Sequence, residues 1–273
     1  MKMSNRRTLF ALTLLLIGSL SCSLFFPATP APEITTTPSI TDTPTPPPTA
    51  TFTPVPVSRL VEMTSIHFEE SGQSPNYTIT SETPSLAGLD DPRIHAFNSR
   101  ASDIVNGDID EFKASLKYMP ETPLTSGSFI DVGYEVLSPP GDPLSLKFNV
   151  IGYGDGAAHP YHYSQTLTFD LEQGKEIKLE QLFLPGSKYL EALADYCKVE
   201  LTKRDIDFGS FSSGADPTSE NYRNWNITPA GLLITFDEYQ VAAYAAGPQT
   251  VLIPYADLKT ILDPSGLLAR FIP

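Results

Sequence analysis

Apolar and polar residues alternate with a period of two in several short stretches, the pattern of strands that bury one face. Two such stretches open the C-terminal four fifths of the chain. Three more follow, joined by short Gly- and Pro-containing turns typical of an antiparallel meander. The predicted strands cover residues 59–69, 77–82, 129–137, 145–153, 161–170, 224–228, 232–236 and 249–253.

Three other segments repeat their apolar residues at helical spacing. The first starts at Asp91-Pro92, a capping residue followed by a proline suited to the first turn, and its apolar stripe runs from Ile94 to Leu116. The others cover residues 187–204 and 255–262. We therefore predict an α+β fold, with antiparallel sheets and two long packed helices in two intimately packed subdomains.

The N-terminal segment, residues 1–22, reads as a lipoprotein-type export signal. Three basic residues precede an uncharged apolar run and a small-residue patch, and Cys22 follows as the expected lipidation site. The alternatives are an uncleaved membrane anchor, since residues 8–26 form an uncharged run of 19, or secretion after ordinary cleavage. We predict an extracytoplasmic protein tethered to the cell membrane.

Residues 23–58 are rich in proline and threonine, with ten prolines between positions 27 and 58. Such a composition cannot bury a core, so we interpret it as a stalk. The remainder divides into a small α+β subdomain at 59–125 and a larger α+β domain at 126–273. Cys197 lies at helical spacing with Leu193 and Leu201, which predicts a buried thiol rather than a reactive one.

The chain is acidic, with a formal charge of −14 that becomes −17 once the three basic residues of the signal are removed. Nucleic acid and anionic lipid headgroups are poor partners for such a surface. A cationic partner is favoured, mainly through its rate of association.

His159 and His162 form an H-x-x-H pair close to Asp155. In a strand, residues three apart point to opposite faces, so a metal site is disfavoured, and we expect His159 to hydrogen-bond backbone and fix the turn. We predict no metal and no cofactor. A wall-active hydrolase or metal-dependent enzyme centred on these three residues is the alternative.

Carboxylate pairs for glycoside hydrolysis can be drawn, such as Asp237 with Glu238 or Asp155 with Asp170. The adjacent pair Asp237 and Glu238 is more typical of a solvated strand end. The sequence contains no G-x-S-x-G, P-loop or H-E-x-x-H motif. We therefore assign no catalytic residue and expect a protein that is not an enzyme.

Tyrosines surround two loops, and tyrosine beside glycine and small residues makes a good recognition surface. The alternative is that these rings cap the core and bond through their hydroxyls. The residues predicted to bind a ligand are Tyr161, His162, Tyr163, Glu238, Tyr239 and Tyr244.

Three blocks of the sequence carry a family resemblance. The first contains Gly156, Ala157, His159 and Pro160 with Phe169 and Asp170; the second is 179–183, leading into the helix at 187; the third is 231–254. Together they resemble the extracytoplasmic domain shared by RsiV-type anti-sigma factors and PdaC-type peptidoglycan deacetylases. Residues 76–79 and 91–105 look like the smaller domain that precedes it.

The resemblance implies a module outside the membrane, which in RsiV-type proteins binds lysozyme. Here about eight residues precede the apolar run, too few to hold a sigma factor, and no deacetylase domain is expected. The resemblance thus implies a stand-alone lipoprotein that binds a lysozyme-like protein or a peptidoglycan fragment. An envelope assembly module without a small ligand is a further alternative.

Overall fold

The computed structural model describes residues 55–141 and 143–271. The predicted signal, its Cys22 lipidation site and the predicted stalk up to residue 54 lie outside the described residues. Within the described ranges, no helix combines the length and the hydropathy that crossing a membrane requires.

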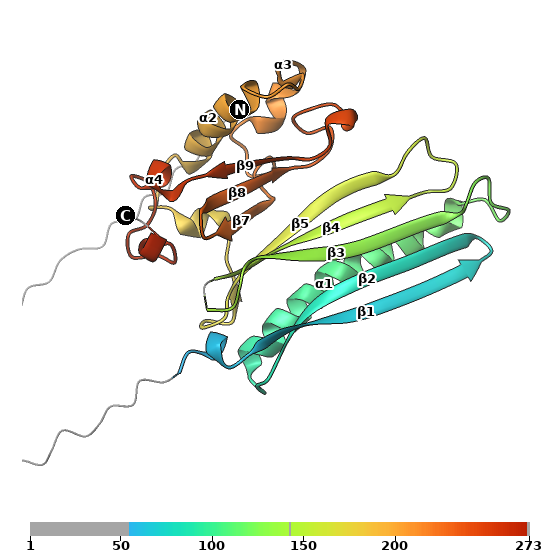
Figure 1. The fold of residues 1–273 in the computed structure, drawn as a ribbon, viewed down its shortest axis with the longest axis horizontal. Coiled ribbons are helices and arrows are strands. Elements are labelled where there is room, and N and C mark those ends of the chain that lie inside the picture. Colours follow the sequence, from blue (N-terminus) through green and yellow to red (C-terminus); the bar gives the residue numbers. More distant parts are fainter. Residues whose placement is uncertain (1–54, 142, 272–273) are drawn as a thin grey trace, which may run out of the picture. The chain divides into compact units, whose positions relative to one another are not determined.

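A six-stranded sheet contains its strands in sequence order (Figure 1). The strands are β1 (Glu62–Gln73), β2 (Asn76–Ala87), β3 (Ser128–Ser138), β4 (Leu144–Tyr153), β5 (Tyr161–Asp170) and β6 (Lys175–Glu176). All neighbours are antiparallel except β2 and β3, which run parallel. The sequence predicts antiparallel sheets, and this prediction is wrong for the β2–β3 pair, because the helix between these strands returns the chain to the end from which β2 started.

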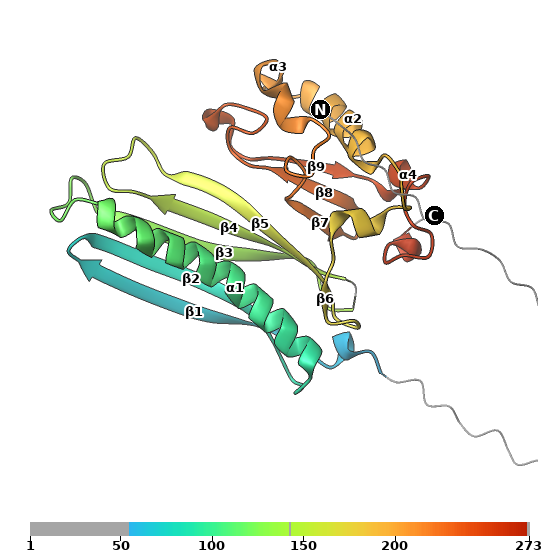
Figure 2. The same cartoon turned by 180° about the vertical axis from the view of Figure 1, so that it is seen from behind.

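That helix is α1 (Pro92–Ser115), which lies along one face of the sheet (Figure 2). Its predicted start is confirmed, since Asp91 Oδ1 accepts a hydrogen bond from the Arg93 backbone N–H at 2.9 Å and Pro92 occupies the first turn. Its apolar stripe is buried against the strands, and the Phe97 ring meets Phe169 of β5 edge to face at 5.5 Å. The helix therefore covers the sheet as expected.

A three-stranded antiparallel sheet forms the second layer: β7 (Trp225–Thr228), β8 (Gly231–Phe236) and β9 (Gln249–Ile253). The helices that accompany it are α2 (Tyr189–Thr202), α3 (Phe208–Phe211) and α4 (Tyr255–Leu258). The described 3-10 turns are η1 (Val57–Arg59), η2 (Leu116–Tyr118), η3 (Leu179–Leu182), η4 (Ser212–Ala215), η5 (Tyr244–Ala246) and η6 (Ala269–Phe271). The mixed α+β class is confirmed.

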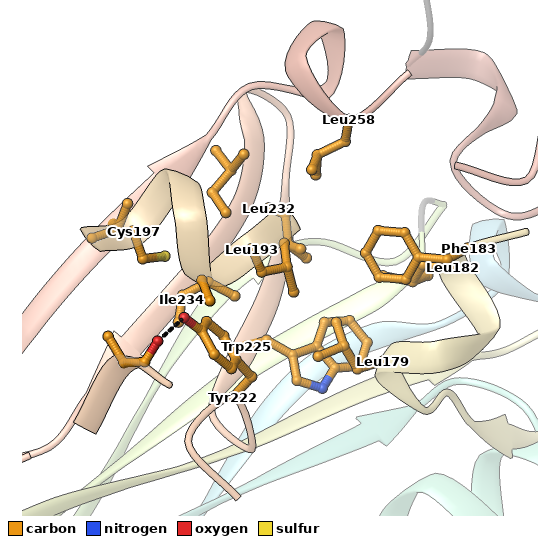
Figure 3. Packing of buried hydrophobic residues seen from close by; sticks show 14 of the residues in the cluster. Leu179, Leu182, Phe183, Leu193, Cys197, Tyr222, Trp225, Leu232, Ile234 and Leu258 are labelled. Atoms are coloured by element: carbon orange, nitrogen blue, oxygen red, sulfur yellow. Dashed lines mark hydrogen bonds between the residues drawn. The ribbon is translucent and has the colours of Figure 1, made fainter. Parts of the chain in front are cut away.

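Cys197 of α2 lies inside the core of this second layer, beside Tyr222 and Ile234 (Figure 3). Its side chain is fully buried, which confirms the prediction, and burial raises the pKa of the thiol to about 12. The Tyr222 hydroxyl stays satisfied in this apolar setting because it donates to the Ala215 carbonyl at 3.0 Å.

Two hydrophobic cores divide the described chain, and the change from one to the other falls between Leu171 and Ile177. The sequence predicts a subdomain boundary at 125/126, but β3 to β5 join the sheet of β1 and β2 through the parallel pair. The end of the predicted stalk also belongs to the first core. Val57 and Ser58 are buried there, and their backbone N–H groups donate to the carboxylate of Glu172 at 3.4 and 3.2 Å.

Candidate functional site

The outer edge of β5 is closed by side chains rather than by a strand. β5 pairs with β4 along its length but with β6 only at Phe169 and Asp170. On the free edge, the backbone N–H of Ser164 donates to Asp237 Oδ1 at 2.8 Å, and that of His162 donates to Glu238 Oε2 at 3.2 Å. Exposed strand edges invite pairing with other chains, so two carboxylates from the end of β8 protect this one.

Asp237 is the buried member of this carboxylate pair, 7% exposed. Besides Ser164 it accepts hydrogen bonds from Arg223 Nη2 at 2.7 Å and Asn224 Nδ2 at 3.0 Å. Burial raises its pKa, and the bonds from Ser164 and Arg223 oppose that rise. The expectation of a solvated strand end is wrong, because both carboxylates turn back onto β5.

Glu238 holds the imidazole of His162, with Glu238 Oε1 2.8 Å from His162 Nδ1. The Glu238 side chain is 9% exposed and that of His162 33% exposed, so the pair borders solvent on the histidine side. An imidazole oriented by a carboxylate is the arrangement of a general base, so proton transfer is within the chemistry of this pair.

The turn after these carboxylates presents Tyr239 to solvent. Gln240 fixes the turn, because its backbone N–H donates to the Asp237 carbonyl at 3.1 Å and its side-chain amide donates to the Gly214 and Asn221 carbonyls at 3.0 Å each. Tyr239 has φ +64°, the one positive φ outside glycine among the described residues, and it is 55% exposed. A bulky residue in this region of backbone space is strained.

The rings of His159, Tyr239 and Tyr244 form what we call the aromatic cluster. The Tyr244 ring lies 3.9 Å from His159 and 5.6 Å from Tyr239, measured between centroids. The carbonyl of Pro160 accepts from His159 Nδ1 at 2.8 Å and from the Tyr244 hydroxyl at 2.9 Å. The predicted backbone hydrogen bond of His159 is confirmed. Gly156, at φ +89°, turns the chain just before it.

Both histidines of the H-x-x-H pair lie beside Tyr244, with ring centroids 3.9 Å (His159) and 6.4 Å (His162) from that of Tyr244. The expectation that they point to opposite faces is wrong, because His159 belongs to the loop before β5 and strand alternation does not reach it. Asp155 faces elsewhere, accepting the backbone N–H groups of Leu124 and Thr125 at 2.6 and 2.9 Å. Within residues 55–141 and 143–271, no three His, Cys, Asp or Glu side chains gather as metal ligands would.

Tyr161 and Tyr163, predicted to share a site with His162, lie on the opposite face of β5. The Tyr163 hydroxyl donates to Asp108 Oδ1 of α1 at 2.8 Å, whereas His162 faces Glu238. Neighbouring residues of a strand point to opposite sides, so six predicted residues form two separate groups. The other family-motif residues are structural: Phe169 packs on α1, and Asp170 accepts the backbone N–H groups of Glu172 and Gln173.

Asp108 and Gln165 were missed as candidates. Gln165 Nε2 donates to both oxygens of Asp108, at 2.7 and 2.8 Å. A signal was present for Asp108, because it stands four residues from Ile104 and from Phe112 and so interrupts the apolar stripe of α1 with a charge.

Residues 180–256 match a family described as a protein of unknown function, DUF3298. Over 158 residues the chain is 27% identical to the peptidoglycan-N-acetylmuramic acid deacetylase PdaC of Bacillus subtilis strain 168. The match covers 57% of this chain and 34% of PdaC, so the chain spans about a third of that relative's length. Tyr239 and Tyr244 lie within the matched family segment, whereas His159 and His162 lie outside it.

Two solved structures share the fold. A DUF3298 family member from Bacteroides fragilis NCTC 9343 superposes with a TM-score of 0.58 at 15% identity, covering 77% of this chain and 97% of that one. A DUF3298 family protein from Pseudomonas aeruginosa PAO1 gives a TM-score of 0.55 at 16% identity, with 78% and 97% covered.

Proposed function

We propose that this protein is a binding module that works outside the cytoplasm, tethered by its N-terminal segment, and recognises a cell-wall-associated ligand. The ligand is a peptidoglycan fragment or a lysozyme-like protein, and the aromatic cluster with the His162–Glu238 pair forms its site. We further propose that the chain is an RsiV-like lipoprotein acylated at Cys22, without catalytic activity of its own.

The observation that carries the proposal is the strained backbone and exposed ring of Tyr239. Its positive φ costs conformational energy in the folded state, and its side chain, 55% exposed, buries little apolar surface in the core. Strain retained at an exposed aromatic residue is typical of a functional site. The strain holds the ring beside Tyr244 and His159, so three ring faces and the His162–Glu238 pair border one surface.

This surface suits a saccharide that carries amide groups. Ring faces pack on the apolar faces of sugars, and the imidazole edge and tyrosine hydroxyls offer hydrogen bonds at the rim. The similarity to a peptidoglycan deacetylase supports the same class of ligand. The net charge of −14 supports the second ligand, a cationic muramidase, through faster association.

Calorimetric titration of the full-length chain in a mild detergent tests the proposal, with a soluble muropeptide and a cationic lysozyme as separate ligands at two salt concentrations. We expect one of them to bind saturably at both, and Tyr239→Ala to weaken that binding at least tenfold. Tyr118→Ala is the matched control, because Tyr118 is 78% exposed on η2, outside the aromatic cluster.

Binding that survives Tyr239→Ala would reject the aromatic cluster as the site. Heat from lysozyme that disappears at the higher salt would indicate charge attraction alone. Release of sugar or acetate during incubation with the muropeptide would favour the enzymatic alternative, and His162→Ala would then abolish it.

A further inference from the structure

A cavity of about 510 Å³ opens on the face of β5 that looks toward α1, the side away from the aromatic cluster. The second half of α1 forms one wall and the start of β5 the other. Residues that shape it are Asp108, Glu111, Met119, Tyr161, Tyr163 and Gln165. Its chemistry differs from that of the aromatic cluster, because carboxylates and tyrosine rings meet here inside a recess.

Gly152 sets the position of the Tyr161 ring. The two residues face each other across the β4–β5 ladder, and a Cβ on Gly152 would stand 2.2 Å from Cζ of Tyr161. The ring therefore lies across the space that a side chain at 152 would fill. It runs nearly parallel to the ring of Tyr163, with 6.1 Å between centroids and an interplanar angle of 11°. Tyr161 remains 41% exposed, so the cavity has an accessible aromatic wall.

The cavity carries negative charge without a compensating cation. Asp108 is 5% exposed, and the hydrogen bonds it accepts come from the neutral Tyr163 hydroxyl and Gln165 amide. Glu111, one turn further along α1, adds a second carboxylate. No lysine or arginine of the described chain lines the cavity, and Lys113 is paired with Glu70 at 2.7 Å. The pKa of Tyr161 is raised, mainly by burial and then by the negative charges of Glu111 and Asp108.

We propose that this cavity binds an organic cation, an alkylammonium or guanidinium group. Glu111 and Asp108 supply the opposite charge, and the rings of Tyr161 and Tyr163 supply π faces for the same cation. A carboxylate buried without a cation is in an unfavourable state, which a bound cation relieves. The site is separate from the aromatic cluster, and it stands whether or not a cell-wall ligand binds there.

Saturation-transfer NMR on the full-length protein in detergent tests this with butylammonium as the probe and n-butanol as its neutral counterpart. Butylammonium is expected to bind saturably and to weaken with added salt, while butanol gives at least fivefold less transfer. Glu111→Gln, which changes an exposed side chain and keeps its shape, should weaken binding about fivefold. Gly152→Ala should do so too, by displacing the Tyr161 ring.

Tyr239→Ala is the matched control, because it alters the opposite side of β5, and it should leave butylammonium binding unchanged. Equal binding of butanol, or binding insensitive to both Glu111→Gln and Gly152→Ala, would overturn the proposal. Lysine amide acetylated on its α-nitrogen, which leaves the side-chain ammonium charged, serves as a third probe. Binding at least as tight as butylammonium assigns the cation to a peptide side chain, and weaker binding assigns it to a free amine; either result requires the cation and supports the site.

Discussion

Two buried aspartates lie on opposite sides of β5, and their surroundings differ. Asp237 has an arginine, an asparagine and a backbone N–H as donors, so its charge is compensated inside the protein. Asp108 has a tyrosine hydroxyl and a glutamine amide, with Glu111 as its charged neighbour. Both have a raised pKa because of burial. The charge on the Asp237 side is therefore compensated, and its hydrogen bonds hold two layers together, whereas the Asp108 side has room for a cation from outside.

The largest loss of stability is expected when the hydrogen bonds to Asp237 are removed. Asp237→Ala leaves the Ser164 N–H, the Asn224 amide and Nη2 of Arg223 without their acceptor and should lower the free energy of unfolding by about 3 kcal/mol. Urea denaturation measures it. Glu220→Ala is the control, because it removes the exposed partner of Arg223, and it should cost less than about 0.5 kcal/mol. Similar losses for the two variants would contradict the comparison.

A smaller loss is expected from Ser145→Ala, further along the same side. Ser145 Oγ accepts from Asn226 Nδ2 at 2.9 Å and from the Ile227 N–H at 3.1 Å, so it joins β4 to β7 in a buried setting. Its removal should cost about 2 kcal/mol in the free energy of unfolding. Ser71→Ala, on exposed β1, should stay within about 0.5 kcal/mol. Thermal unfolding of both variants in parallel gives the result.

The uncompensated side should respond differently. Asp108→Asn removes a buried charge that has no cation, while its amide oxygen still accepts, so we expect a change within about 1 kcal/mol at neutral pH. The raised native pKa makes the stability that Asp108 contributes complete below its unfolded pKa of about 4 and lost as pH rises through the native pKa. Urea midpoints between pH 4 and 7 should therefore fall with pH relative to Asp108→Asn. A difference between the two midpoints that stays constant from pH 4 to 7 would contradict a raised native pKa for Asp108.

The smallest effect, a gain, is expected in the aromatic cluster. Tyr239→Gly removes the strain of a side chain at φ +64° and should raise the free energy of unfolding by about 0.5–1 kcal/mol while ligand binding is lost. Tyr118→Gly, at an exposed position with ordinary backbone, should not stabilise. Denaturant titration of the two variants separates these outcomes. A stability loss at Tyr239 would mean that its ring supports the fold.

Most elements follow from the sequence because their signals are local. The Asp91-Pro92 start of α1 and the alternation in β3 to β5 act within a few residues. The parallel pairing of β2 with β3 has no such signal, since it depends on how the intervening helix returns the chain. That pairing moves the division between the two cores from the predicted 125/126 to beyond Leu171.

The site could be predicted residue by residue but not as a surface. Strand alternation was sufficient to separate Tyr161 and Tyr163 from His162, since neighbours in a strand face opposite ways. What alternation cannot provide is the identity of the partner on each side: Glu238 is 76 residues from His162, and Asp108 is 55 from Tyr163. Such contacts arise from tertiary packing, so the two groups appeared as one.

The attachment of Val57 and Ser58 to Glu172 has a mechanical consequence. Glu172 follows the end of β5, while Tyr161 opens the strand, so the N-terminal entry and the aromatic end are separated by a ten-residue strand, about 30 Å. A ligand held at one end and an anchor pulling at the other would load the module along its strands. Ladder hydrogen bonds run across that direction, so they would share such a load in shear rather than open one after another.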